Sequence, residues 1–304
     1  MERFVGIEAG GTKFVCAIGN RQGEISERTV FPTETPEIVL PKIIDYIHQQ
    51  ALHGKIDAIG IGCFGPLELD RKSSQYGSIT ATPKPGWRYF NIVEKFKNLF
   101  DLPIGFDTDV NAAALGEHYW GAAQQSDHFI YLTVGTGIGG GVMINGKLLH
   151  GALHPEMGHL LIPQDKTQDA FEGICPYHHN CLEGLASGPS LMKRWGVESA
   201  LDLPPEHEAW DLEAYYLAAA CANYTLTLSP QKIILGGGVM KQKNLFSKIH
   251  QLLPNLLNNY ILHENITNTD KIKDYIIPAG LGDNAGIAGA IALAVQSYAY
   301  QEIA

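Results

Sequence analysis

Alternating apolar and polar or small residues predict short β-strands along much of the chain, and two segments have the same pattern. The first, residues 3–25, is an apolar strand, the turn Gly10–Thr12, a second apolar strand and a polar glycine turn. The second, residues 128–151, repeats this order, with its small-residue turn at Gly135–Gly137. A hairpin of this kind presents backbone N–H groups at its tip. Two copies predict two duplicated α/β lobes.

Between and after these hairpins, helical and strand-like segments alternate, which favours an α/β sheet in each lobe. In the first lobe we expect helices and strands at residues 36–52, 56–65, 92–100, 103–110 and 111–123. In the second lobe we expect a helix over residues 211–230 that is N-capped by Asp211, then a strand at 231–239 and a helix at 244–253.

The domain boundaries follow from this alternation. We expect a first lobe at residues 1–117, joined by the C-terminal helix at about residues 287–304, and a second lobe at residues 118–286. The second lobe carries a loop-rich insertion at about residues 151–188, and so long a segment without periodicity usually has a functional or metal-held reason to exist.

Charge and hydropathy exclude several classes of function. The 304 residues include 32 acidic and 22 basic residues, a net charge of −10, and no run of Lys or Arg interrupts the acidic balance. Because binding to a phosphate backbone requires clustered cations, we expect no nucleic-acid partner. The strongly apolar run at residues 285–295 is too short for a bilayer, which requires about 20 residues. With no signal-peptide pattern at the N-terminus, we expect a cytoplasmic protein without a membrane partner.

A cluster of cysteine and histidine residues predicts a metal site. Cys175, His178 and Cys181 follow one another at steps of three, and His159 lies sixteen residues before Cys175. Together they form a closed Cys₂His₂ set, which leaves no open position for water and therefore indicates a structural Zn²⁺. His154 or His179 remains an alternative fourth ligand. The other three cysteines lie in apolar segments, where reduced core thiols are expected.

Three glycine-rich turns follow predicted strands. They lie at Glu8–Lys13, Val134–Gly141 and Leu235–Val239. Small residues at the end of a strand let backbone N–H groups approach phosphate oxygens closely, although each turn could equally be a structural hairpin. Neither the P-loop signature nor a dinucleotide fingerprint is present.

Two aspartates lie where a predicted strand leads into a helix. Alternation along the strand predicts that Asp107 and Asp109 share one side, with Asn111 just beyond. A carboxylate there can accept a proton from a hydroxyl group. The alternative interpretation is that one of the two aspartates N-caps the helix.

With these motifs in order, the chain resembles the ROK family of sugar kinases and repressors over nearly its full length. The resemblance is carried by the segments GIEAGGTK, GIGCFGP, DVNAAALGE, TVGTGIGGG, EMGH, CLEGLASGPS, ILGGGV and PAGLGDNAGIAGA. It implies a ribonuclease H-like, actin-like ATPase fold in which two α/β lobes close over ATP and a sugar. A homodimer is also implied.

The resemblance also implies roles for individual residues. Asp109 matches the catalytic aspartate, which takes the proton from a sugar hydroxyl as it attacks ATP. Glu8 stands where the family often has an aspartate near Mg²⁺. The implied sugar-binding positions are Gly65, Thr108, Asn111, Glu156, His159 and Glu183. The implied nucleotide-binding positions are Glu8, Gly10, Gly11, Thr12, Lys13, Thr133, Gly135, Thr136, Gly137, Pro189, Gly236, Gly237, Gly238 and Val239. The implied zinc ligands are His159, Cys175, His178 and Cys181.

Departures from the common family pattern narrow the expected substrate. Many members have Asn-Asp where this chain has Thr108-Asp109, and the zinc loop has His178 in place of a cysteine. These departures, with the motif TPKPGW at Thr82–Trp87, resemble the bacterial fructokinase branch. We therefore expect fructose to be phosphorylated on its 6-hydroxyl by ATP·Mg²⁺. The alternatives are a mannokinase or glucokinase, a transcriptional regulator, and a zinc-binding interaction module without catalysis.

Overall fold

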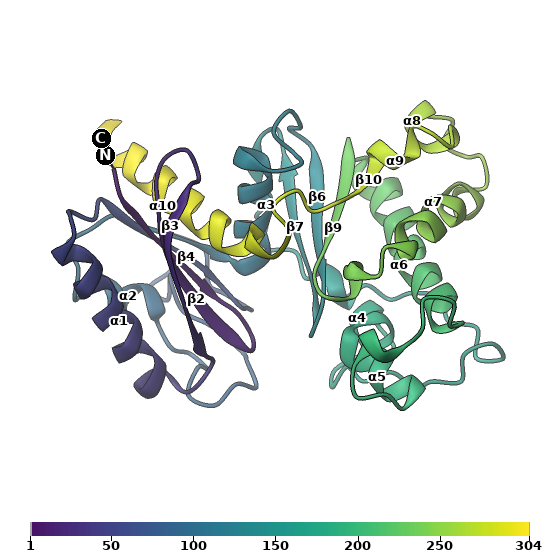
Figure 1. Cartoon of the computed structure of the whole chain (residues 1–304), viewed down its shortest axis with the longest axis horizontal. Coiled ribbons are helices and arrows are strands. Elements are labelled where there is room, and N and C mark those ends of the chain that lie inside the picture. The colour runs from purple at the N-terminus through teal and green to yellow at the C-terminus, as the bar shows by residue number, and fades with distance from the viewer. Residues whose placement is uncertain (1, 304) are drawn as a thin grey trace.

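The chain folds into two α/β lobes, each built on a five-stranded mixed sheet (Figure 1). The structure, a computed structural model, describes residues 2–303. The strands of the first sheet are β1 (Phe4–Ala9), β2 (Lys13–Gly19), β3 (Ile25–Pro32), β4 (Ala58–Cys63) and β5 (Ile104–Thr108). The strands of the second are β6 (Phe129–Val134), β7 (Ile138–Ile144), β8 (Lys147–Leu148), β9 (Lys232–Gly236) and β10 (Ile276–Pro278).

The two sheets have the same topology, as the repeated hairpin predicts. Their strand orders are β3-β2-β1-β4-β5 and β10-β9-β6-β7-β8. In the first sheet β1 pairs antiparallel with β2 and parallel with β4. In the second, β6 pairs antiparallel with β7 and parallel with β9. In both sheets the glycine-rich turn of the hairpin therefore adjoins the carboxyl end of a central parallel strand, the edge where α/β proteins bind ligands.

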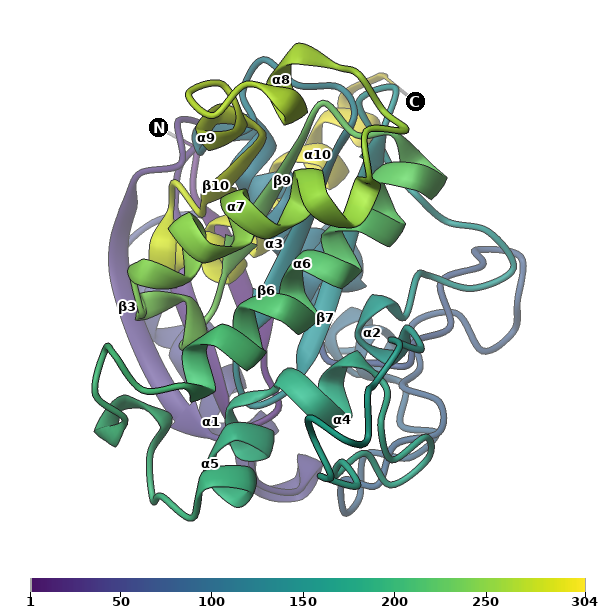
Figure 2. The same cartoon turned by 90° about the vertical axis from the view of Figure 1, so that its right-hand side faces the viewer.

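Helices cover both sheets. The α-helices are α1 (Pro36–Leu52), α2 (Ile92–Lys97), α3 (Asp109–Trp120), α4 (Leu182–Ala186), α5 (Gly188–Trp195), α6 (Ala209–Leu228), α7 (Asn244–Leu257), α8 (Glu264–Thr267), α9 (Ile272–Tyr275) and α10 (Ala285–Ile303). Helices α6 and α7 lie over the outer face of the second sheet (Figure 2). The predicted loop-rich insertion contains only the short 3₁₀ helix η1 (Met157–His159) before α4.

Helix α10 returns from the second lobe to the first, where it packs on β1, β4 and β5 and crosses α3. Small residues make this close packing possible. A Cβ atom on Gly60 of β4 would lie 1.8 Å from the carbonyl oxygen of Ala290, and one on Gly289 would lie 1.7 Å from that of Ala112 in α3. The close neighbours of α10 therefore require its alanine-rich and glycine-rich sequence. This packing places α3 and α10 between the two sheets.

One predicted helix boundary is wrong. Helix α6 begins at Ala209, and Glu208 occupies the N-cap position without a capping side-chain hydrogen bond. Asp211 therefore lies within the first turn and does not cap the helix. Tertiary packing extends the helix, because Trp210 is 1% exposed and its Nε1 donates to the carbonyl oxygen of Pro204 at 2.9 Å.

Within residues 2–303, none of the helices combines the length and apolar character that crossing a bilayer would require.

The α3–α10 crossing predicts a large loss of stability in Gly289→Ala. The added methyl group would overlap the backbone of Ala112, so a helix must shift, and overpacking of this kind costs about 2 kcal/mol or more. Gly151→Ala is the matched control, because its Cβ would meet only the carbonyl oxygen of Leu153 at 3.7 Å. Urea unfolding followed by circular dichroism measures both changes. Equal stability of the two variants would contradict the proposed crossing.

Candidate active site and metal centre

The carboxylate of Asp109 stands at the first residue of α3, directly after β5. Thr108 caps this helix, since its Oγ1 accepts from the backbone N–H of Asn111 at 3.0 Å. The interpretation in which an aspartate caps the helix is therefore wrong. Asp109 Oδ1 accepts from the N–H of its neighbour Val110 at 2.9 Å, and the carboxylate also interacts with the backbone N–H of its own residue. With the cap supplied by Thr108, the carboxylate of Asp109 is left for other chemistry.

Three carboxyl groups near this point have raised pKa values. Burial raises the pKa of Asp109 from 3.8 to about 6, and the charge of Lys84 partly opposes this shift. Burial and then the negative charge of Asp109 raise the pKa of Glu8, at the end of β1, to about 7. The same two causes raise the pKa of Glu156, in the loop before η1, to about 7. Such mutual perturbation is typical of functional sites.

The two lobes meet beside these carboxylates. A Cβ atom on Gly65, just after β4, would lie 3.2 Å from Cε1 of His154 and 3.6 Å from Oε1 of Glu156. The structure thus brings together two positions of the predicted sugar site, Gly65 and Glu156. His154 is buried, and its Nε2 accepts from the N–H of Leu67 at 3.0 Å. This hydrogen bond joins the lobes and directs His154 away from the cysteine cluster.

Asp107, two residues before Asp109, belongs to a hydrogen-bonded group that includes His150, an exposed residue that sequence reasoning missed. Asp107 Oδ2 lies 2.8 Å from Nε2 of His150, and Asp107 Oδ1 accepts from Nδ2 of Asn111 at 2.7 Å. Asn111 is 0% exposed, and its amide group is held by Asp107. Asp107 and His150 line a cavity of about 540 Å³ between β5, the turn that joins β7 to β8, and α10. Asp107 and Asp109 therefore have different partners, which strand alternation did not predict.

The glycine turn of the first lobe closes through a hydrogen bond from the N–H of Gly10 to the carbonyl oxygen of Lys13, at 3.0 Å. Gly11, Thr12 and Lys13 are exposed at its tip. Glu8 precedes the turn, and its carboxylate lies near the position that a Cβ on Gly286 would occupy, 2.4 Å from Oε1. The start of α10 thus approaches the same turn.

In the second lobe, three predicted nucleotide-binding segments converge. The N–H of Gly188 at the start of α5 donates to the carbonyl oxygen of Gly135 at 2.8 Å, which places Pro189 beside this turn. The backbone nitrogen of Gly238 lies 3.8 Å from the position of a Cβ on Gly135. Gly237 adopts φ = +92°, a conformation that favours glycine. The remaining predicted positions on these segments are Thr133, Thr136, Gly137, Gly236 and Val239.

Glu183 links the insertion to the second turn. It lies in α4, and its Oε2 accepts from the backbone N–H of Ile138 at 2.9 Å. A Cβ atom on Gly137 would lie 2.6 Å from the same oxygen. The second glycine turn and the end of the insertion therefore hold each other in place.

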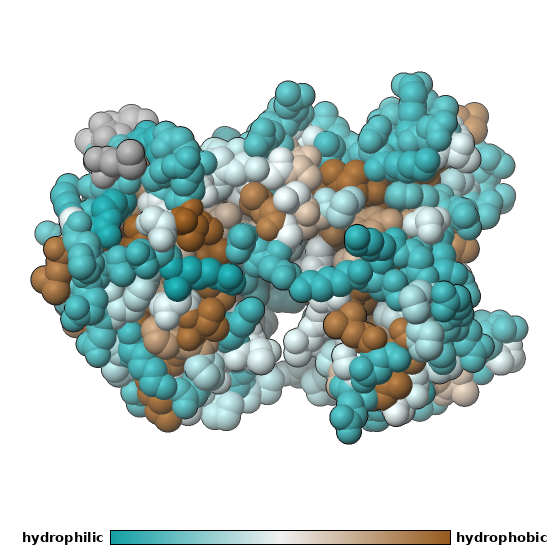
Figure 3. Space-filling model, viewed as in Figure 1, coloured by the Kyte–Doolittle hydropathy of each residue, from teal (hydrophilic) through white to brown (hydrophobic). Residues whose placement is uncertain are grey.

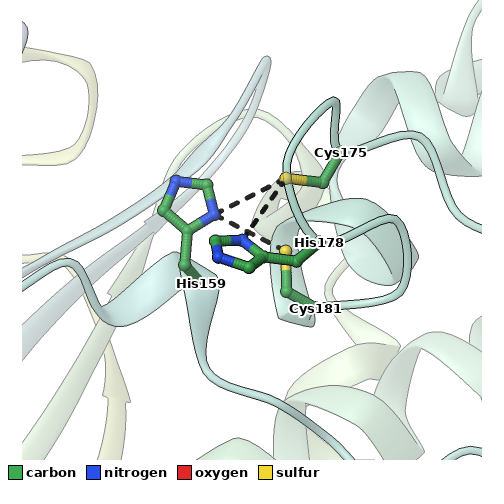
Figure 4. Close-up of side chains that lie close together, drawn as sticks. All are labelled: His159, Cys175, His178 and Cys181. Atoms are coloured by element: carbon green, nitrogen blue, oxygen red, sulfur yellow. Dashed lines mark hydrogen bonds between the residues drawn. The ribbon is translucent and has the colours of Figure 1, made fainter. Parts of the chain in front are cut away.

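The predicted metal ligands form one compact group (Figure 4). Nδ1 of His159 lies 3.7 Å from Sγ of Cys175 and 3.5 Å from Sγ of Cys181. Nδ1 of His178 lies 3.8 Å from Sγ of Cys175, and all four donor atoms lie within 4.8 Å of one another. In tetrahedral zinc coordination, nitrogen and sulfur ligands are separated by about 3.6 Å. The donor set and its spacing therefore fit a Zn²⁺ ion.

Backbone pairing presents the four ligands. Cys175 and His179 exchange two backbone hydrogen bonds across a tight turn that carries His178, and Cys181 bridges Leu161. His179 belongs to this backbone frame, while its side chain lies outside the group of four donors. His159 enters from η1, which follows Glu156 directly. The metal group thus connects η1 to the start of α4.

Figure 3 shows the surface hollowed between the two lobes. The carboxylates at the ends of β1 and β5, the glycine turns of both sheets and the loop before η1 all come from facing parts of the lobes. An arrangement of this kind can hold a polyphosphate by backbone N–H groups and hold a hydroxyl group beside a carboxylate.

Comparisons with known proteins agree with this geometry. The model of the ROK family matches residues 4–297. A Bacillus subtilis protein is 51% identical over 96% of this chain and 95% of its own. The fructokinase of Pediococcus pentosaceus is 44% identical, covering 95% of this chain and 96% of its own. The glucokinase of Halalkalibacterium halodurans is 32% identical over 78% of this chain and 81% of its own.

The fold is also found among solved structures. The ROK hexokinase from Thermus thermophilus has a TM-score of 0.76 and 27% identity, covering 99% of both chains. The predicted ribonuclease H-like, actin-like ATPase fold with two α/β lobes is thereby confirmed.

The raised pKa of Asp109 predicts that Asp109→Asn stabilises the fold at alkaline pH. The folded carboxyl holds its proton up to about pH 6, whereas the unfolded chain releases it near pH 3.8. Stability is therefore lost as pH rises through this interval, and above pH 6 the cost is about 3 kcal/mol. Asparagine can still accept from Val110 but carries no charge. Urea unfolding should show a gain at pH 8 that shrinks at pH 5.

The exposed residue Asp101 supplies the control for this prediction. Asp101→Asn should leave the free energy of unfolding unchanged at both pH values. An Asp109→Asn variant that is less stable than the wild type at pH 8 would show that the carboxylate of Asp109 is favourable where it lies.

Proposed function

The chain belongs to the ROK family, and from this premise we propose that it is a fructokinase, which transfers the γ-phosphoryl group of ATP to the 6-hydroxyl of fructose. The observation that carries the proposal is the position of Asp109. Its carboxylate is not used to cap α3, and it lies between the one glycine turn of the first lobe and the loop of Glu156 from the second. A regulator or an interaction module would not require this group.

The proposed reaction is an in-line displacement. Asp109 accepts the proton of the 6-hydroxyl, and the hydroxyl oxygen forms a bond to the γ-phosphorus while the bond to the bridging oxygen of ADP breaks. A pKa of about 6 leaves Asp109 ionised near neutral pH and able to accept this proton. Backbone N–H groups of the turns that follow β1 and β6 hold the phosphates in line, so positioning supplies much of the acceleration.

Glu8 is the residue that we assign to the metal of the nucleotide. Its carboxylate stands at the end of β1 beside the first glycine turn, and hard oxygen ligands suit Mg²⁺. Bound Mg²⁺ would neutralise charge on the phosphates. Burial and then repulsion from Asp109 raise the pKa of Glu8. A nearby Mg²⁺ ion would offset this repulsion.

The preference for fructose rests on the curated relatives and on Thr108. A fructokinase is 44% identical to this chain, whereas a glucokinase is 32% identical. Many family members have an asparagine amide at the position of Thr108, and here the hydroxyl is committed to capping Asn111. The sugar would accordingly be held by the main chain near Gly65 and by Glu156, His159 and Glu183.

We assign a structural role to Zn²⁺ at His159, Cys175, His178 and Cys181. Four protein ligands leave no open position for a substrate, so the ion would hold the insertion together. Glu156 precedes the ligand His159 by three residues, and Glu183 follows the ligand Cys181 by two. Fixing the ligands would thus fix both carboxylates beside the sugar. A cytoplasmic homodimer remains the family-based expectation for the assembled enzyme.

An ADP-release assay with ATP·Mg²⁺ tests the function. Fructose should give the highest kcat/KM among fructose, mannose, glucose and N-acetylated hexosamines, with little ADP released when sugar is absent. Asp109→Asn should lower kcat by about 10² to 10⁴-fold, because it removes the general base. Asp101→Asn should retain full activity. Higher kcat/KM with mannose or glucose would assign the enzyme to that sugar, and sugar-independent turnover would indicate an ATPase.

Metal analysis tests the zinc site. The purified protein should contain about one Zn²⁺ per chain, and Cys181→Ser should lose the metal together with thermal stability, since binding energy is folding energy at such sites. His179→Asn is the matched control. It tolerates the left-handed backbone at φ = +56° and should keep the full metal content. Loss of zinc in His179→Asn but not in Cys181→Ser would reverse the ligand assignment.

A further inference from the structure

Lys84 lies in the motif Thr82–Trp87, which has no role in the mechanism proposed above. The segment has no helix or strand of its own, yet it follows β4 in the chain and reaches back to the first glycine turn. Lys84 is half-buried although it is a lysine in an irregular loop. A lysine that gives up hydration in this way needs a compensating partner.

Trp87 anchors the segment in the core of the first lobe. Its side chain is 1% exposed, stacks on Phe14 at 5.4 Å and meets Phe64 edge-on at 5.6 Å between ring centroids. Its Nε1 donates to the carbonyl oxygen of Glu34 at 2.8 Å, and its backbone N–H donates to that of Lys84 at 3.2 Å. The position of Lys84 is therefore fixed by a buried aromatic cluster, although the residue itself lies in a loop.

The ammonium group of Lys84 rests on the first glycine turn. Its Nζ donates to the carbonyl oxygen of Gly11 at 2.6 Å and lies 5.2 Å from the ring centroid of Phe64. A Cβ atom on Gly11 would lie 3.4 Å from Nζ, so the lysine occupies the side of the turn that a glycine leaves open. An ammonium group has three N–H donors, and the carbonyl of Gly11 uses one of them.

Lys84 also acts electrostatically on the general base. Burial lowers the pKa of Lys84, and the negative charge of Asp109 opposes that shift. The charge of Lys84 in turn lowers the pKa of Asp109. The ammonium group is therefore close enough to both the phosphate turn and Asp109 to act on a group held between them.

We propose that Lys84 contacts the transferred phosphoryl group and stabilises the negative charge on its oxygens as it passes from ATP to the sugar. The inference rests on the proposed function. As the hydroxyl oxygen bonds to the γ-phosphorus, the electron pair of the breaking bond goes to ADP and the proton goes to Asp109. Lys84 donates hydrogen bonds to the peripheral oxygens and exchanges no proton. A fixed cation at this place costs no reorganisation during transfer.

The kinetic test compares three variants under the conditions of the ADP-release assay. Lys84→Met should lower kcat by about 10² to 10³-fold, the usual cost of removing one donor to developing charge, and should change the KM for fructose little. Lys84→Arg retains a cation and should retain more activity than Lys84→Met. Lys97→Met, at an exposed position of α2, should behave as the wild type.

The pH dependence of kcat/KM distinguishes a catalytic role of Lys84 from a role in supporting the loop. Three charged side chains interact electrostatically with Asp109: Lys84 of the motif Thr82–Trp87, Glu8 of β1 and Glu156 of the loop before η1. Lys13 and Arg28 act on Glu8, whereas Lys84 is the cation that lowers the pKa of Asp109. Removing it in Lys84→Met should move the acid limb of kcat/KM to higher pH, while Lys84→Arg should leave the limb in place. A lysine that only supports the loop would instead lower thermal stability in Lys84→Met and leave the limb unmoved.

Nucleotide binding tests the contact independently of the sugar. Lys84→Met should weaken binding of the β,γ-imido analogue of ATP by about tenfold, the equivalent of one charged hydrogen bond, and leave binding of ADP within about twofold. This difference is measurable even if the wild type phosphorylates none of the sugars, in which case the proposed function fails separately. Unchanged analogue binding together with a kcat within about threefold of the wild type would overturn the role of Lys84.

Discussion

The close crossing of α3 and α10 is the constraint on which the rest of the structure depends. The two helices meet backbone to backbone, because a Cβ on Gly116 would lie 2.8 Å from the nitrogen of Gly289. At the far end of α3, the buried carboxylate of Glu117 accepts from the N–H groups of Ala122, Gly280 and Leu281. These hydrogen bonds tie the exit of α3 to the chain that leads into α10. The position and direction of α3 are thus determined from both ends, and Asp109 is the first residue of this helix.

Fixing α3 so firmly permits an electrostatically unfavourable site at its start. Glu8, Asp109 and Glu156 all have raised pKa values, which means that their ionised forms cost free energy in the folded protein. The scaffold tolerates this cost because the elements that carry two of these groups, β1 and α3, are held by α10. A substrate phosphate with its metal, and a sugar hydroxyl in place of water, would relieve part of the repulsion. The free energy stored in the carboxylates thus favours the loaded state of the cleft.

The sequence predicted the repeated hairpins, the main helices and the grouping of His159, Cys175, His178 and Cys181, because each has a local pattern such as alternation, a glycine turn or regular spacing. The details that escaped prediction depend on the tertiary structure, which determines where a helix begins and which side chains meet. Thr108 caps α3, a role that requires knowing where the helix starts. His150 meets Asp107 across 43 residues, and no local pattern marks it. Helix α6 begins before Asp211 because Trp210 is buried in the core of the second lobe, with its Nε1 donating to Pro204 six residues earlier.

The two irregular segments that border the site are rigidified by different means. The insertion has little apolar content near His178, which is exposed, so four metal ligands can replace a hydrophobic core there. The motif around Lys84 has no such ligands, and the buried ring of Trp87 fixes it instead. Zn²⁺ held by two thiolates and two neutral imidazoles would carry no net charge and would fix the loop that bears Glu156 and Glu183. The aromatic anchor is also neutral, so it leaves the positive charge of Lys84 undiminished beside the first glycine turn. The two irregular segments therefore reach the site with different supports, one through four side-chain ligands and the other through a buried ring.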